Sequence, residues 1–293
     1  MSSSGFTAWG SIRPAGASIL AGLVALALAG SSQAGGWTRE RGTFYSRTAA
    51  NRYQADREFD GRGDRRDLAL EGEFRDLNLS TYFEYGLTDR LTAIAATSIK
   101  SIRSENLVKV VETKGLSDVE LALRTALARG TYGVTAVQAL VKIPSGYDPK
   151  VELPIGNGEG ELDLRGQYGR SLWPVIPGYC GLEVGYRFRG GKPANELRYL
   201  AECGSDLGGG SYVRAKLDGI RGQRTETIYD SNLNPTLRGS SDVGALDLTA
   251  GLKLGTRLAV EAGYTTALYG RTTTAGSTVN VALAWTGRIG SAR

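Results

Sequence analysis

The chain has 293 residues, with 35 Lys and Arg against 30 Asp and Glu, a net charge of +5, and no histidine. Charges of both signs with so small an excess argue against a nucleic-acid-binding protein. Without histidine there is no Ser-His-Asp catalysis and no His-ligated metal, so we expect neither an enzyme nor a cofactor or metal site. Glycine is abundant (41), proline scarce (8) and tyrosine the main aromatic residue (14), which favours strands and tight turns.

Residues 1–34 have the features of a secretory signal peptide. A basic residue precedes an apolar run at 17–29, and the sequence SQA at 32–34 suits cleavage after Ala34. The alternative, an anchor that stays attached, is disfavoured because the run is short for a membrane helix. We expect residues 35–293 to form one domain, and they contain no apolar stretch long enough for such a helix.

Residues 77–99 contain a clear hairpin signal. At 77–87 (LNLSTYFEYGL) every second residue from Leu77 is apolar or threonine, and the residues between them are polar, glycine or tyrosine. Such alternation places the two sets on opposite faces of a β-strand. The turn at 87–90 (LTDR) leads into a second run at 91–99, so we expect an antiparallel hairpin.

The same period-two pattern recurs along the chain, most regularly at 161–168 (ELDLRGQY). We expect about twelve strands, at residues 43–59, 77–87, 91–99, 117–127, 134–143, 161–168, 179–189, 195–204, 213–218, 246–254, 258–265 and 279–286. Since every predicted element is a strand, the predicted fold class is all-β.

The connections between these strands alternate in length. The short ones are 87–90, 128–132, 206–210 and 255–257. The long ones are 60–72, 103–116, 144–158 and 221–241, and 190–194 is short where a long loop is due. Outer-membrane barrels have short periplasmic turns, longer outer loops and an even number of strands, whereas a soluble sandwich expects no such difference. We therefore predict a transmembrane antiparallel up-and-down β-barrel with periplasmic termini.

The polar face of each strand would line the lumen of such a barrel. The charged residues predicted there are Glu84, Asp118, Glu120, Arg124, Lys142, Glu161, Asp163, Arg165, Glu183, Arg187, Glu196, Arg198, Arg214, Lys216, Asp247, Lys253 and Glu261. A lumen lined with charges of both signs fits either a polar channel or a largely closed interior in which the charges pair with one another. Carboxylate pairs suitable for acid–base catalysis are disfavoured, because neighbouring cations offer ion pairs instead.

The two cysteines test the register of one hairpin. Arg187 can pair with Glu196 across the connection 190–194. Seven residues further from this connection on each strand, the same register places Cys180 opposite Cys203. Directly opposed residues are close enough for a disulfide, and an exported protein meets an oxidising compartment. We predict a structural cross-strand bridge near the periplasmic end; the alternative is two unpaired thiols that face lipid.

Five segments carry a resemblance to a known family: YFEYGLTDRLT (82–92), GLSDVEL (115–121), EVGYRFR (183–189), NELRY (195–199) and EAGY (261–264). They resemble outer-membrane barrels of the phenol meta-cleavage-pathway transporter family and the related XagA-like proteins linked to polysaccharide and biofilm gene clusters. The resemblance covers most of the mature chain and implies architecture and location, with transport as the presumed activity. Its motifs are barrel motifs and name no substrate.

The sequence therefore predicts a porin-like protein of the Gram-negative cell envelope, inserted in the outer membrane after export. The predicted function is passage of small solutes through a charged lumen. The alternative is a non-conducting surface barrel that supports exopolysaccharide export, biofilm formation or adhesion. The expected partners are outer-membrane lipid, the barrel-assembly machinery and a small solute or a polysaccharide, with no nucleic acid.

Overall fold

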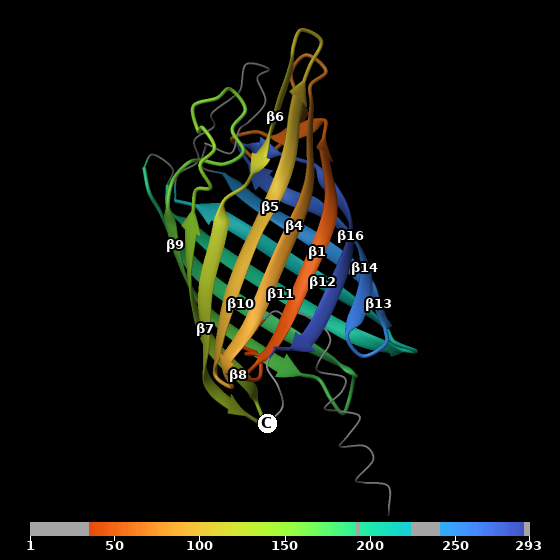
Figure 1. Ribbon diagram of the computed structural model, residues 1–293. Helices are drawn as coiled ribbons and strands as arrows, with labels where there is room; N and C mark the ends of the chain where they lie inside the picture. The colour runs from red at the N-terminus through yellow and green to blue at the C-terminus, as the bar shows by residue number, and fades with distance from the viewer. Residues whose placement is uncertain (1–34, 192–193, 224–240, 290–293) are drawn as a thin grey trace, which may run out of the picture.

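The computed structural model describes residues 35–191, 194–223 and 241–289, which form a closed antiparallel β-barrel (Figure 1). The strands of its wall, in spatial order, are β1 (Thr43–Ala55), β4 (Glu73–Thr88), β5 (Leu91–Glu105), β7 (Val119–Gly130), β8 (Gly133–Ile143), β9 (Glu161–Ser171), β10 (Gly178–Arg189), β11 (Glu196–Gly208), β12 (Ser211–Gly222), β13 (Asp242–Leu254), β14 (Leu258–Arg271) and β16 (Ser277–Arg288). β16 pairs with β1 and closes the wall, so the predicted twelve-stranded up-and-down barrel is confirmed. The predicted signal peptide and most of the 221–241 loop lie outside the described residues.

We call the end of the barrel with the short connections the turn rim and the opposite end the loop rim. At the turn rim, residues 89–90, 131–132, 172–177, 209–210 and 255–257 join the strands. Thr43 pairs with Arg288, so the first and last strands of the wall also begin and end at this rim. This shared rim follows from the even number of strands. The longer connections all lie at the loop rim, which is the asymmetry typical of outer-membrane barrels.

Four short strands lie outside the wall. β2 (Arg57–Phe59), β3 (Arg65–Asp67) and β15 (Thr273–Thr274) form a small sheet of their own. β6 (Val110–Leu116) pairs with the end of β5, so the two form a hairpin that projects above the barrel (Figure 1). The predicted loop at 103–116 is therefore wrong, and so is the single strand at 43–59, because β1 ends at Ala55.

The change of side-chain pattern along β5 explains the first of these errors. Near the middle of the strand the outward side chains are apolar, as at Ile99, which is 61% exposed. Further along, Arg103 faces outward and forms an ion pair with Glu105, whereas Ile102 faces inward and is buried. Where the strand leaves the apolar band of the barrel its two faces exchange character, and this exchange looks like the end of a strand in the sequence.

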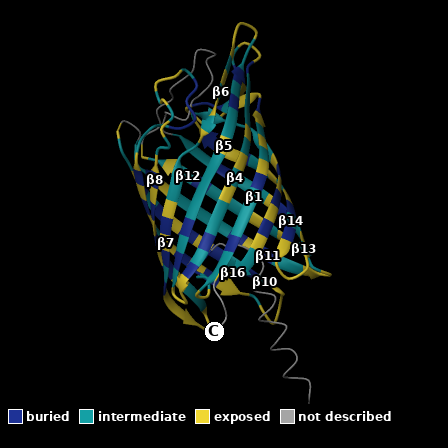
Figure 2. Cartoon of the chain, viewed as in Figure 1, coloured by how far each residue is buried: buried dark blue, intermediate teal, exposed yellow. Residues whose placement is uncertain are grey.

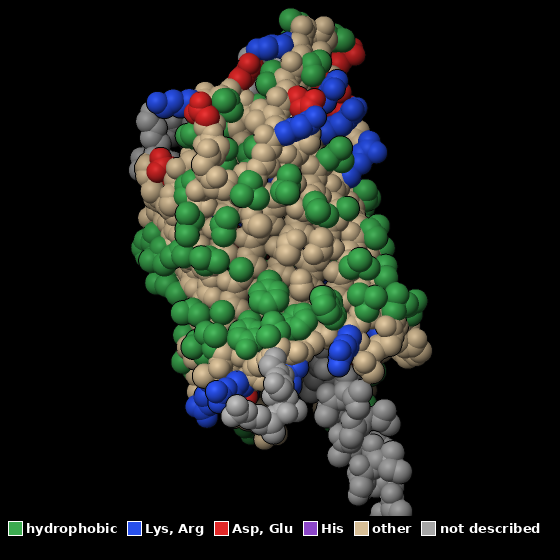
Figure 3. Space-filling model, viewed as in Figure 1, with side chains coloured by type: hydrophobic (Ala, Val, Ile, Leu, Met, Phe, Trp, Pro, Cys, Tyr) green, Lys and Arg blue, Asp and Glu red, His purple; other side chains and the backbone are tan. Residues whose placement is uncertain are grey.

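The wall has the burial pattern of a membrane barrel (Figure 2). On β9 the apolar Leu162 and Leu164 are exposed, whereas the acidic Glu161 and Asp163 between them are buried. Exposed apolar side chains recur on the other strands and cover the outside, with charged side chains towards both ends (Figure 3). An apolar surface of this extent needs a non-aqueous partner, which excludes the soluble sandwich and identifies the outer surface as the lipid-facing one.

Cys180 and Cys203 face each other in the ladder between β10 and β11, in the same register that pairs Arg187 with Glu196. Their sulfur atoms are bonded and their Cα atoms lie 4.1 Å apart. Both residues lie on the outward face close to the turn rim. Among the described residues there is no helix long and apolar enough to cross a membrane.

Candidate functional site

The inner face of β8–β11 carries a network of buried ion pairs. Its members form two rows across the strands: Lys142, Glu161 and Arg189, and then Asp163, Arg187 and Glu196. Glu161 Oε1 lies 2.9 Å from Lys142 Nζ and 3.0 Å from Arg189 Nε. Arg187 Nε lies 3.0 Å from Asp163 Oδ2. Burial of these charges is tolerated because each has an opposite charge beside it and its hydrogen bonds are made within the network.

The strand geometry accounts for this network. Inward residues are two apart along a strand, and the antiparallel register sets acidic positions of β9 opposite basic positions of β10. Arg165 extends the network towards the middle of the lumen, with Nε 2.7 Å from Asp163 Oδ1 and Nη1 3.5 Å from Glu183 Oε2. Glu120 on β7 joins it through Arg187 Nη2 at 3.3 Å.

A second cluster on the opposite wall is built around Glu261 of β14, whose side chain is fully buried. Glu261 Oε2 lies 2.6 Å from Arg47 Nε and 3.5 Å from Arg214 Nη2, and Tyr212 donates its hydroxyl hydrogen to Oε1 at 2.7 Å. The sequence did not predict Arg47 as a lumen residue. The first strand (TFYSRTAANRYQA) mixes polar and apolar residues on both faces, so its inward face could not be assigned from the alternation.

Residues 35–42, which we call the terminal segment, lie inside the turn rim. Arg39 Nε forms an ion pair with Glu84 Oε2 at 2.7 Å. Arg124 Nη1 donates to Glu84 Oε1 and to the backbone oxygen of Trp37, both at 3.1 Å. A side chain at Gly86 would overlap the carbonyl oxygen of Glu40, so the wall and the segment are closely fitted. The segment narrows the lumen at this rim.

The indole of Trp37 is the apolar part of this contact. It packs edge-on against Tyr179, with ring centroids 5.6 Å apart, and it covers Gly169 so closely that a β-carbon there would overlap the ring. The backbone N–H of Gly35 donates to Glu183 Oε1 at 3.3 Å. Sequence reasoning missed the terminal segment because it forms no strand; the only signal was a tryptophan after two glycines.

At the loop rim, residues 144–160 fold inward over the lumen. Tyr147 donates its hydroxyl hydrogen to Asp118 Oδ1 at 2.5 Å, and Lys142 Nζ donates to Asn157 Oδ1 at 2.7 Å. Leu153 and Ile155 of this loop pack in a buried cluster with Ile102 of β5. Burial, together with the hydrogen bond to Asp118, raises the pKa of the Tyr147 phenol, so it stays protonated and remains a donor at neutral pH.

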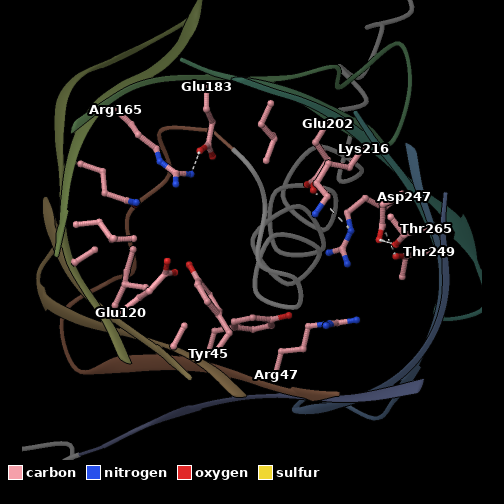
Figure 4. A pocket seen from close by; sticks show the side chains of 18 of the residues that line it. Tyr45, Arg47, Glu120, Arg165, Glu183, Glu202, Lys216, Asp247, Thr249 and Thr265 are labelled. Atoms are coloured by element: carbon pink, nitrogen blue, oxygen red, sulfur yellow. Dashed lines mark hydrogen bonds and ion pairs between the residues drawn. The ribbon is translucent and has the colours of Figure 1, made fainter. Parts of the chain in front are cut away.

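Between these two covers lies a cavity of about 600 Å³ (Figure 4). Its charged lining consists of Arg47, Glu120, Arg124, Arg165, Glu183, Glu202, Arg214, Lys216 and Asp247. Its amides are Asn51, Asn78, Gln138, Gln167 and Asn280. One side is apolar, where Tyr82 packs on the buried cluster of Ile94, Ala122 and Leu140. Cavities of this size suit small molecules, and this one presents both charges, amides and an apolar patch to them.

The structure brings many of the predicted lumen residues together, but not all at one place. Seven line the cavity: Glu120, Arg124, Arg165, Glu183, Arg214, Lys216 and Asp247. Seven are held in the networks around it: Glu84, Lys142, Glu161, Asp163, Arg187, Glu196 and Glu261. Arg198 borders a small neighbouring pocket and Asp118 lies under the loop at 144–160. Lys253 is separate, paired with Asp206 Oδ1 at 2.9 Å.

Besides Arg47, sequence reasoning left Arg39 and Arg189 out of the lumen. Within the described residues, no three His, Cys, Asp or Glu side chains are grouped so that they could hold a metal ion. The site offers fixed charges and hydrogen-bonding groups to a solute that enters the lumen.

Comparison with known proteins supports the fold. No protein-family model and no curated protein matches this sequence. Among solved structures, the COG4313 outer membrane channel from Pseudomonas putida F1 superposes with a TM-score of 0.66 at 12% identity, over 86% of this chain and 98% of the channel. The translocator domain of the autotransporter NalP from Neisseria meningitidis gives 0.52 at 12% identity, over 85% of this chain and 90% of that domain. At such identities the likeness is one of fold.

Proposed function

We propose that this protein is an outer-membrane channel that admits small polar solutes through its charged lumen. The observation that carries the proposal is a polar cavity of about 600 Å³ enclosed by a wall whose outer face is apolar. A barrel whose lumen is packed with side chains needs no such cavity. A path for solutes, by contrast, requires polar groups along an open interior.

The same proposal includes location and partners. Export by the signal peptide, with cleavage after Ala34, would deliver the chain to the assembly machinery and to outer-membrane lipid. The fold likeness to an outer membrane channel supports this location, and the resemblance of segments such as 82–92 to transport barrels of the phenol meta-cleavage-pathway family points the same way.

One observation favours the second candidate, a non-conducting barrel that supports polysaccharide export or adhesion. The terminal segment lies inside one rim and residues 144–160 cover the other, so both ends of the lumen are narrowed. In that case the outer connections, rather than the lumen, would meet the partner.

Single-channel recording in a planar bilayer separates the two candidates. We expect the purified, refolded mature chain to give stable current steps whose size rises with salt concentration. A barrel that is folded, as judged by its heat-dependent mobility on a gel, and yet carries no current at any voltage would contradict the channel proposal and favour the second candidate. Heat-unfolded protein is the control for leakage.

A further inference from the structure

One row of residues crosses the cavity wall from β11 to β14. In register it runs Glu202, Lys216, Asp247 and Thr265, and all four side chains line the cavity. Figure 4 shows Lys216, Asp247, Thr249 and Thr265 gathered on this side of the lumen. The row places the Lys216 ammonium between two carboxylates, of which Glu202 accepts a hydrogen bond from Tyr179 and lies 3.8 Å from Arg214 Nε.

Asp247 is held in place by neutral donors. Thr249 Oγ1 donates to its Oδ1 at 2.9 Å and Thr265 Oγ1 donates to its Oδ2 at 2.7 Å. No Lys or Arg of the described chain lies within 4.0 Å of this carboxylate, although Lys216 is its register neighbour. It therefore differs from Glu261, which two arginines neutralise. A carboxylate that accepts two hydroxyl hydrogen bonds keeps its full charge and has free lone pairs for a cation.

Lys216 is the matching cation. Its shortest ion pair in the described chain is with Asp218 Oδ2 at 3.8 Å, and its side chain is 29% exposed. Lys142, by comparison, has two carboxylates at 2.9 and 3.1 Å. An ammonium has three donors, so most of the hydrogen-bonding capacity of Lys216 is open to the lumen.

Gln167 supplies an independent sign of a missing partner. Its side chain lines the same cavity from β9, is only 3% exposed, and has no hydrogen-bond partner in the described chain for either its nitrogen or its oxygen. Buried polar groups are nearly always paired, so an orphaned amide that faces a cavity indicates that something else occupies the space. Its amide nitrogen and oxygen are themselves buried, so a polar molecule in the cavity meets them only when the side chain turns towards the lumen.

We propose that this cavity binds a small zwitterion, a molecule with an ammonium and a carboxylate on adjacent atoms as in a free amino acid. Its carboxylate lies on Lys216, its ammonium lies on Asp247, and Gln167 meets a polar side group. Lys216 and Asp247 are directly opposed on neighbouring strands but their charged groups are more than 4.0 Å apart, and the flexible lysine stem lets the ammonium meet one end of a head group whose other end lies on Asp247. A simple anion is attracted by Lys216 but repelled by Asp247. A simple cation is attracted by Asp247 but repelled by Lys216, so the two residues together select against both kinds of ion.

The proposal deepens the channel function, because it names the solute class, but binding can be tested without conduction. The probes are L-alanine, propionate, which lacks the ammonium, and ethylamine, which lacks the carboxylate. Titration calorimetry on the folded mature protein in detergent should give an affinity for alanine about tenfold higher than for either analogue, since each lost charge contact is worth that much. Equal affinity for propionate or ethylamine, or no heat from alanine, overturns the assignment.

Three variants locate the site. Lys216→Gln and Asp247→Asn should each weaken alanine binding about tenfold, whereas Lys253→Gln, which removes an inward lysine outside the cavity, should leave it unchanged. L-Glutamine should bind more tightly than alanine, and Gln167→Leu should abolish that difference. If the protein binds alanine but carries no current, the channel proposal fails and this one stands. If it conducts but does not bind alanine, the reverse holds.

A separate observation carries a second inference, which rests on the expected cleavage after Ala34. The backbone nitrogen of Gly35 lies 3.3 Å from Glu183 Oε1, and within the described residues Glu183 forms one ion pair, with Arg165 at 3.5 Å. Gly35 and Gly36 are buried, and a β-carbon on either would overlap the backbone of β8 or β9. We propose that cleavage turns this nitrogen into an ammonium that pairs with Glu183 and fastens the terminal segment inside the turn rim.

Two measurements test this contact. Amino-terminal sequencing of protein isolated from membranes should begin at Gly35. Acetylation of the amino terminus should lower the unfolding temperature by about 2–4 °C, and Glu183→Gln should remove the effect of acetylation. A different first residue, or equal loss on acetylation with and without Glu183, overturns the proposal.

Discussion

Under the proposed channel function, replacing Arg165 with glutamine should make the barrel more selective for cations. Arg165 lines the cavity, and its partner Asp163 keeps an ion pair with Arg187 at 3.0 Å after the change. The network therefore survives, and the change removes one positive charge from the solute path. This separates an effect on the path from an effect on folding, which a change at Arg187, with three carboxylate partners, would not do.

The magnitude follows from Coulomb's law. A unit charge about 5 Å from a permeating ion contributes about 0.8 kcal/mol in water, and about 0.5 kcal/mol after screening at about 0.1 M salt. The sign is opposite for a cation and an anion, so the difference is about 1 kcal/mol and the cation-to-anion permeability ratio rises about fivefold.

The assay is the reversal potential across a bilayer with a potassium chloride gradient. Arg170→Gln is the matched control, because Arg170 is on the same strand but on the outward, exposed face. We expect a shift towards the potassium potential for Arg165→Gln and none for Arg170→Gln. Equal reversal potentials for wild type and Arg165→Gln would refute a path through this cavity.

Three other outcomes are expected. Removing the disulfide with Cys180→Ser and Cys203→Ser should lower the free energy of unfolding by about 3 kcal/mol, because the bridge closes a loop of 23 residues. Urea unfolding measures this loss, and the conductance should stay the same. An unchanged urea midpoint would contradict the bridge. Glu261→Gln should cost about 3–5 kcal/mol, because Arg47 and Arg214 lose the fully buried carboxylate that they share. The loss should appear as a lower temperature of heat modification on gels, and wild-type stability would show that the cluster is not structural. A mature chain without residues 35–41 should conduct about twofold more than the full chain, because the turn rim is then open; an equal or smaller conductance would locate the narrowest point elsewhere.

The sequence determined the fold class, the inward and outward faces of the wall strands after the first, and the register of one hairpin. These follow from local rules, since alternation sets the faces of a strand, and short connections fix which strands are neighbours. The alternation at 161–168 was sufficient to place Glu161, Asp163 and Arg165 on one face, and the pairing of Arg187 with Glu196 was sufficient to bring Cys180 opposite Cys203.

Only the tertiary structure decided which charges neutralise one another and which stay available. Glu261 and Asp247 look alike in the sequence, as inward acids on neighbouring strands, yet one is enclosed by Arg47 and Arg214 and the other by two threonine hydroxyls. The positions of the terminal segment and of the loop at 144–160 inside the lumen could not be predicted from the sequence. Neither has a periodic pattern, and both are positioned by contacts with residues far away in sequence. Closure of the barrel brings such residues together, and ion pairing falls off over a few ångströms, so the chemistry of the lumen depends on distances that no linear pattern contains.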